Sequence, residues 1–165
     1  MAFDAFIQID GIPGETTDDK YKDWIEVLSF DHGLEQPASS TASSAGGATA
    51  ERVNHSPFVF EHVLDKATPK LAEACCKGTH IKEVTFALCR AGGEKTQYYE
   101  VKLEQVLVSK VEPKGAANDD GFPSERISLS YGTIKWTYTQ QARADGTGSG
   151  NIATGWDLTK NMATA

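Results

Sequence analysis

Several short polar runs contain residue types that could bind a phosphate or a metal ion. The run Gly146–Gly150 alternates glycine with hydroxyl side chains, but no Lys-Ser or Lys-Thr pair follows it, and its spacing is not that of a nucleophile elbow. The run Asn118–Gly121 lacks the alternating oxygen ligands and the closing glutamate of a calcium loop. Both runs are therefore predicted to be solvated surface loops.

The four histidines form no recognisable site in the sequence. His55 and His62 are seven residues apart on one predicted extended segment, so we expect their side chains to lie on opposite faces and not to share an ion. His32 and His80 have no sequence neighbour that would complete a base–nucleophile pair. The sequence therefore predicts neither an enzyme nor a bound metal, and it indicates no cofactor.

The three cysteines do not match the spacing of a zinc site. Cys75 and Cys76 are adjacent, and a disulfide between neighbours is strained. Free thiols are typical of the reducing cytoplasm, although a Cys75–Cys89 bridge stays open as an alternative.

The charge of the chain narrows the classes of partner. Among 165 residues, 16 Lys and Arg stand against 23 Asp and Glu, which gives a net charge of −7. This balance argues against nucleic acid and against an anionic membrane, because both require clustered cations. Tyr98, Tyr99 and Trp136 are accordingly assigned to core packing in preference to base stacking. No run is apolar enough to cross a bilayer, so no membrane insertion is expected.

The first residues contain no basic region and no long apolar stretch, so they do not resemble a secretory leader. We therefore expect synthesis in the cytoplasm, and any export would proceed without a cleaved signal peptide.

Most of the elements that would position these residues are strands. Residues 3–9 alternate apolar and polar side chains, which is typical of a half-buried strand. The segments Trp24–Leu34 and Gln105–Val108 are apolar on both parities, which predicts strands that are covered on both faces. The apolar parity changes at Gly132–Thr133, which predicts a β-bulge there. A last short strand is expected at Gly155–Leu158.

A single short helix and one long loop interrupt the strands. Thr68 is predicted to be the N-cap, Pro69 the first helical residue and Gly78 the left-handed C-cap. The uncharged run Pro37–Ala50 has no bulky side chain and predicts an extended loop over residues 37–52. Many strands with one short helix favour a mostly β, antiparallel barrel or sandwich in a single domain covering residues 1–165.

The order of short motifs along the chain resembles the Hcp family, the haemolysin-coregulated proteins that build the inner tube of type VI secretion systems. Each motif is weak alone, but together they span nearly the whole chain. They are the first strand over residues 1–9, Gly14-Glu15, residues 25–33, the small-residue loop, residues 65–71, Ala91–Glu94, Val106–Ser109 and Gly155–Leu158.

The resemblance implies an antiparallel β-barrel of two sheets with one short α-helix at the side. It also implies homohexameric rings that stack into a hollow tube, which a contractile sheath expels together with spike and effector proteins. The chain would then be a secreted structural subunit and an effector carrier, without a catalytic role.

Three groups of residues are predicted to serve assembly and cargo. Ser29 and Asp31 are the polar members of an apolar strand and are candidates for contact with effectors in the lumen. Trp24, Leu28, Val106 and Val108 are candidates for the ring interface, since segments that are apolar on both parities need more cover than one barrel interior supplies. The candidate ring-stacking residues all lie in the extended loop and are Ser39, Ser40, Thr41, Ser43, Ser44, Gly46 and Gly47.

The alternative is a monomeric or dimeric barrel whose interior binds a small molecule. The side chains that could line such an interior are Phe58, Phe60, Phe86, Tyr99 and Trp136. They serve equally well as the ordinary core of a small barrel. A third possibility, a hydrolase built on a β-sandwich, is supported by no set of catalytic residues in the sequence.

Overall fold

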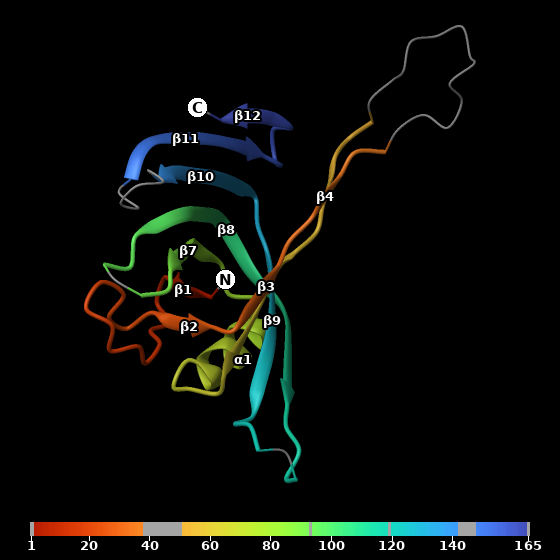
Figure 1. The fold of residues 1–165 in the computed structure, drawn as a ribbon. Coiled ribbons are helices and arrows are strands. Elements are labelled where there is room, and N and C mark those ends of the chain that lie inside the picture. The colour runs from red at the N-terminus through yellow and green to blue at the C-terminus, as the bar shows by residue number, and fades with distance from the viewer. Residues whose placement is uncertain (1, 38–50, 93, 119, 142–147, 165) are drawn as a thin grey trace, which may run out of the picture.

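The computed structural model describes residues 2–37, 51–92, 94–118, 120–141 and 148–164 (Figure 1). These residues contain one helix, α1 (Thr68–Lys77), and twelve strands. The strands are β1 (Phe3–Ile9), β2 (Ile25–Val27), β3 (Ser29–Asp31), β4 (Leu34–Glu35), β5 (Asn54–His55), β6 (Phe58–Val63), β7 (Ile81–Arg90), β8 (Gln97–Lys114), β9 (Ser124–Ser130), β10 (Thr133–Gln141), β11 (Gly148–Asp157) and β12 (Met162–Thr164).

The strands form two antiparallel sheets and a separate ribbon. In sheet A the strands lie in the order β12-β11-β10-β8-β7-β1-β2. Sheet B contains β3, β6, β9 and the second half of β8. The strands β4 and β5 pair only with each other and run away from the body as a narrow arm (Figure 1). The predicted mostly β class with one short helix is confirmed.

The long strand β8 belongs to both sheets and turns from one to the other at Gln105. Its first part pairs with β7 and β10, and its last residues pair with β9. Gln105 has a φ of 54°. Gly132 packs directly against its side chain, since a Cβ atom added at Gly132 would lie only 2.4 Å from the Gln105 Oε1 atom. Gly132 lies in the segment that runs alongside Gln105, and at this glycine the polypeptide likewise passes from β9 in sheet B to β10 in sheet A. The predicted β-bulge at Gly132–Thr133 is therefore wrong, since this glycine marks a corner between sheets.

A second corner lies at Leu28. The predicted single strand over Trp24–Leu34 is wrong, because the structure divides it into three short strands with different partners. β2 pairs with β1 and β3 pairs with β6, while the Leu28 amide between them donates to the Glu61 carbonyl at 2.8 Å. The two sheets therefore meet here without a shared ladder, and the barrel is not closed.

The interior between the sheets is filled by interlocking apolar side chains. Phe58 and Phe86 are at most 1% exposed, and their ring centroids are 5.2 Å apart. Phe30 lies 4.7 Å from Phe86 and extends the same aromatic cluster. On the outer face of sheet A, the segment after β1 packs Tyr21 against Phe6 at 4.5 Å and so covers the buried Cys89. Cys75, Cys76 and Cys89 are all free, so the Cys75–Cys89 bridge is not formed.

The helix α1 begins one residue earlier than the sequence suggests. The N-cap position is Ala67, and Thr68 is already helical. The Thr68 hydroxyl accepts a hydrogen bond from the Asp65 amide at 3.1 Å, while the Asp65 carboxylate accepts one from the Ala67 amide at 2.8 Å. The predicted N-cap at Thr68 is thus wrong by one position. Asp65 and Thr68 together supply the side-chain hydrogen bonds at the start of the helix. No helix in the described part of the chain is long and apolar enough to span a bilayer.

Gly78 ends the helix as predicted, in the left-handed conformation with φ 62°. We expect Gly78→Ala to lower the free energy of unfolding by about 1 kcal/mol, because a Cβ is strained at this φ. Urea unfolding at a fixed protein concentration measures the change. Thr79→Ala, at the exposed next residue, is the matched control and should stay within about 0.5 kcal/mol of the wild type. Equal stabilities of the two variants would contradict the strain argument.

Candidate assembly surface

The outer face of sheet B is polar and carries both predicted lumen residues. Ser29 and Asp31 are exposed on β3, next to Glu61 of β6 and Arg126 of β9. The Ser29 hydroxyl donates to Glu61 at 2.8 Å, and the Arg126 guanidinium lies 3.9 Å from the Asp31 carboxylate. Lys110, exposed on β8, is 3.1 Å from Glu112 on the same strand. This face therefore carries hydroxyl groups and charges of both signs, which suits contact with water or a polar partner.

Sheet A extends past the edge of sheet B, and its last strands form a surface that we call the wing: the core-facing side of β10, β11 and β12. Ile134, buried in the core, begins the apolar row on β10 that continues through Trp136 to Tyr138. Tyr138 and Ile152 are directly opposite each other on β10 and β11 and are 48% and 72% exposed. The wing is the top part of the body in Figure 1. A single copy of the chain thus leaves this apolar side uncovered at its far end.

The sequence missed the size of the wing. A short last strand was predicted at Gly155–Leu158, whereas β11 spans Gly148–Asp157 and β12 follows it. The row on β10 has the alternation of an ordinary core strand, so nothing in the sequence showed that the opposite layer ends before Tyr138.

A groove of about 570 Å³ lies between the wing and the base of the arm. Trp136 and Trp156 border it from the wing, and Leu34, Val53 and His55 border it from β4, β5 and their flanks. Leu34 is 51% exposed. The apolar surface of the wing therefore continues onto the arm.

The structure changes the set of candidate ring-interface residues. Val106 is completely buried and Val108 is 4% exposed, and both belong to the core of one chain. Their surface cannot reach another copy, so this part of the prediction is corrected. Trp24 is half-buried against Tyr21. Leu28 is 55% exposed and shares a shallow groove with Val63 and Leu64.

The candidate stacking residues lie outside the described residues. Ser39, Ser40, Thr41, Ser43, Ser44, Gly46 and Gly47 belong to the segment 38–50. The described flanks of this segment are the two strands of the arm.

The histidine and carboxylate side chains that could take part in catalysis or metal binding lie in separate parts of the fold. His62 is 1% exposed, and its Nε2 atom is 2.8 Å from the Glu125 carboxylate, which is itself buried. His55 lies on the arm and contacts the Tyr131 hydroxyl instead. Among the described residues, no three His, Cys, Asp or Glu side chains gather in a way that could hold a metal ion.

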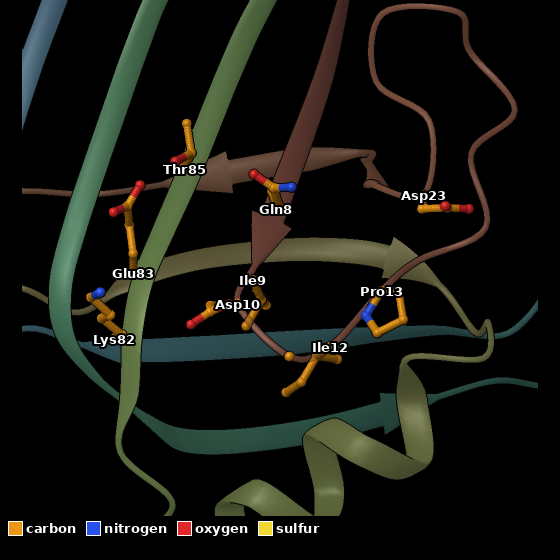
Figure 2. Close-up of a pocket in the computed structure, with 10 residues that line it drawn as sticks. Gln8, Ile9, Asp10, Ile12, Pro13, Asp23, Lys82, Glu83 and Thr85 are labelled. Carbon is orange, nitrogen blue, oxygen red and sulfur yellow. The ribbon is translucent and has the colours of Figure 1, made fainter.

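A hollow of about 400 Å³ lies beside the end of β1 (Figure 2). Figure 2 shows Asp10, Lys82, Glu83 and Thr85 along one side and Asp23 apart from them. Its lining carries three carboxylates and one ammonium group, with no buried polar group directed into it. The interior of the barrel is filled by Phe58, Phe60 and Phe86, so the described residues offer no chamber for the alternative of a ligand-binding barrel.

The chain is similar to known proteins over nearly its whole length. The family model described as type VI secretion system effector, Hcp, matches residues 6–138. Protein hcp1 of Pseudomonas aeruginosa is 33% identical over 98% of this chain and 99% of the relative. A solved structure described as a type six secretion system protein superposes with a TM-score of 0.93 at 31% identity, covering 99% and 100% of the two chains. Hcp1 from Salmonella typhimurium superposes with a TM-score of 0.81 at 31% identity and the same coverage.

The two-sheet fold and these matches define a protein of the type VI secretion system class. The chain belongs to the Hcp family. The resemblance inferred from the order of the sequence motifs is thereby confirmed.

Proposed function

We propose that this chain, acting as one domain, is the subunit of a type VI inner tube. Six copies would form a ring, and the rings would stack into a hollow tube that leaves the cell without a signal peptide. The tube would carry effectors in its lumen and meet sheath and spike proteins at its surface. Membership of the Hcp family supports this role, and the wing supports self-assembly in particular.

The uncovered side of the wing carries the proposal. A lone soluble protein rarely exposes a contiguous apolar patch without a partner. The chain has a second exposed apolar patch, formed by Leu28, Val63 and Leu64 beside the acidic side chains of Glu15 and Glu26. This patch adjoins β2 and the start of α1, at the other end of the molecule from β11 and β12 (Figure 1). Two different patches on one chain are what a head-to-tail ring contact requires.

Native mass spectrometry of the purified protein, with negative-stain images of the same sample, tests the proposal. We expect six copies per particle and a ring with a central hole. A monomer at high concentration would overturn the proposal, and a monomer that retains a small molecule would instead support the ligand-binding alternative.

The polar face of sheet B is proposed to line the lumen, with Ser29 and Asp31 in contact with effectors. We expect Ser29→Tyr combined with Asp31→Tyr to reduce the amount of effector retained on purified rings severalfold, because bulky side chains would fill the space beside β3. Co-purification of a co-expressed effector, with ring size checked by native mass spectrometry, measures the effect. Thr85→Tyr, on the outer face of sheet A, is the control. Intact rings that retain the effector unchanged would remove Ser29 and Asp31 from the contact.

The arm and the loop beyond it are proposed to contact the neighbouring ring, with the seven small residues of the segment 38–50 as the stacking residues. The direction of the arm supports this proposal, since β4 and β5 leave the body side by side (Figure 1). Trp24 and Leu28 stay in the proposed ring interface.

A further inference from the structure

Two half-buried histidines and one buried tyrosine form a cluster that the tube function does not use. The Tyr131 hydroxyl is 2.5 Å from His32 Nε2 and 3.0 Å from His55 Nδ1. The same hydroxyl is 3.3 Å from the Ser56 carbonyl oxygen, to which it can donate. The second ring nitrogen of His55, Nε2, is buried and has no hydrogen-bond partner. One hydroxyl group thus serves two imidazole rings.

The cluster sits at the point where the arm leaves the body. His32 follows β3 and precedes β4, while His55 is the last residue of β5. Tyr131 lies between β9 and β10, on the body itself. The backbone at the same level is joined by the hydrogen bond from the Ser56 amide to the Gly33 carbonyl at 2.9 Å. Tyr131 therefore ties the base of both strands of the arm to the body, and the Arg52 guanidinium adds a hydrogen bond to the Leu158 carbonyl at 3.3 Å.

The number of protons in the cluster decides whether all its contacts can form. A hydroxyl donates one hydrogen bond, so with both rings neutral Tyr131 donates to His32 Nε2 and accepts from the His55 Nδ1 hydrogen. This arrangement leaves only a lone pair unpaired, at His55 Nε2. The opposite arrangement would place an unpaired N–H there, and a buried donor without a partner is costly.

Added protons change these contacts in two steps. When His32 gains a proton, both rings become donors to the Tyr131 oxygen, and the hydroxyl hydrogen turns to the Ser56 carbonyl at 3.3 Å, so the contacts persist with one longer hydrogen bond. When His55 also gains a proton, its buried Nε2 becomes a donor without an acceptor, and two cations then flank one oxygen. The doubly protonated cluster therefore favours an arrangement in which the base of the arm separates from Tyr131.

Few charged groups surround the cluster. Asp31 precedes His32 and favours its charged form, although Arg126 lies 3.9 Å from that carboxylate. Glu51 lines the groove that His55 also borders, and on the side of β6 the neighbour of His32 is the uncharged ring of Phe58. Burial lowers the pKa of His32 from its ordinary value of 6.5, and the nearby His55 lowers this pKa further. Burial also lowers the pKa of His55 and raises that of Tyr131, which stays protonated.

We propose that His32, Tyr131 and His55 form an acid-sensitive latch that fixes the base of the arm above pH 6.5 and releases it as the pH falls. The sign follows from the histidines, because the released state binds protons more readily than the latched state. The latched state is thus fully favoured above the ordinary histidine pKa and loses its advantage below it. The latch is a property of one chain and holds whether or not the chain forms rings.

Hydrogen exchange followed by mass spectrometry tests the latch on peptides that contain residues 33–36 and 53–56. Rates are measured at pH 7.5 and pH 5.0 and corrected for the intrinsic effect of pH on exchange. We expect exchange at the Ser56 amide and along β4 and β5 to rise roughly fivefold at pH 5.0, the factor for losing one ordinary hydrogen bond. Peptides from β7 should show no comparable change and serve as the internal reference.

Three variants make the result specific. His32→Gln with His55→Gln keeps hydrogen-bonding side chains that do not titrate, so the pH effect should vanish. Tyr131→Phe should give fast exchange at both pH values, whereas His80→Gln, which changes an exposed histidine away from the arm, should behave as the wild type. Wild-type exchange that does not depend on pH, or a pH effect that persists in the double glutamine variant, would overturn the latch. Since the readout is local, a monomeric protein would overturn the tube proposal and leave this test intact.

Discussion

Tyr138→Asp combined with Ile152→Asp is expected to convert the proposed rings of this protein into monomers. The two side chains face each other across β10 and β11 and leave 48% and 72% of their surfaces exposed on the wing. If a neighbouring copy covers the wing, each substitution places a carboxylate in an apolar contact. Replacing one such anchor costs about 2 kcal/mol or more, which is roughly a thirtyfold loss of affinity per contact.

Sedimentation velocity and native mass spectrometry at several protein concentrations measure this effect. The matched control is Lys135→Asp, which introduces the same side chain on the same strand but on the opposite face. Circular dichroism and thermal unfolding verify that each variant folds. If the double variant forms rings as readily as the control, the wing does not form the contact between copies.

Glu125→Ala is expected to lower the free energy of unfolding by about 3 kcal/mol, because it leaves a buried hydrogen-bonding group without its partner and a cavity beside it. Glu125 and His62 are each 1% exposed and joined at 2.8 Å, and Asp65 is the next acidic group at 3.8 Å from His62 Nδ1. Removing the carboxylate leaves the imidazole buried without its hydrogen-bond partner.

Urea unfolding at one fixed protein concentration measures the loss, because assembly makes the stability depend on concentration. Glu112→Ala removes an exposed carboxylate on β8 and should change the free energy by less than about 1 kcal/mol. His62→Phe with Glu125→Leu removes both polar groups and should recover most of the loss. A single Glu125→Ala variant as stable as Glu112→Ala would show that the pair contributes little.

Local patterns were sufficient to predict much of the fold. The alternation in residues 3–9 gave β1, and Gly78 was correctly identified as the helix C-cap. The order of weak motifs gave the family, because a conserved order of turns and strands reports on the whole topology even when each motif is short.

The corners of the barrel could not be recognised from the residues alone. Apolar side chains on both parities around Leu28 and Val106 were interpreted as strands covered twice. In the structure each segment changes its alternation once, at the step from β2 to β3 and at Gln105, so the side chains on both sides of the step point to the same core. A change of phase and a second covered face give the same sequence pattern, and only the strand partners distinguish them.

The candidate site likewise contains residues that the sequence could single out and contacts that it could not predict. Ser29 and Asp31 could be selected because they are the polar members of an apolar segment, and the structure places both on an exposed face. Their exposure does not follow from alternation, because Val27 has the same parity and is buried on the other side of the step at Leu28. The exposed end of the wing and the latch both depend on contacts between distant segments. His32 and Tyr131 are 99 positions apart, and nothing local to either residue indicates that they meet.

The shared strand β8 has a consequence for how the chain reaches its native state. The turn before it brings β7 alongside its first half, and the turn after it brings β9 alongside its second half, so both sheets begin from hairpins that are local in sequence. Loop closure over short separations is fast, whereas β1 must pair with β7 across about half of the chain, since Ile9 and Val84 are 75 positions apart. We therefore expect the β7–β8–β9 meander to be the nucleus of refolding, and substitutions within it to slow the folding rate more than those in β1 or β12.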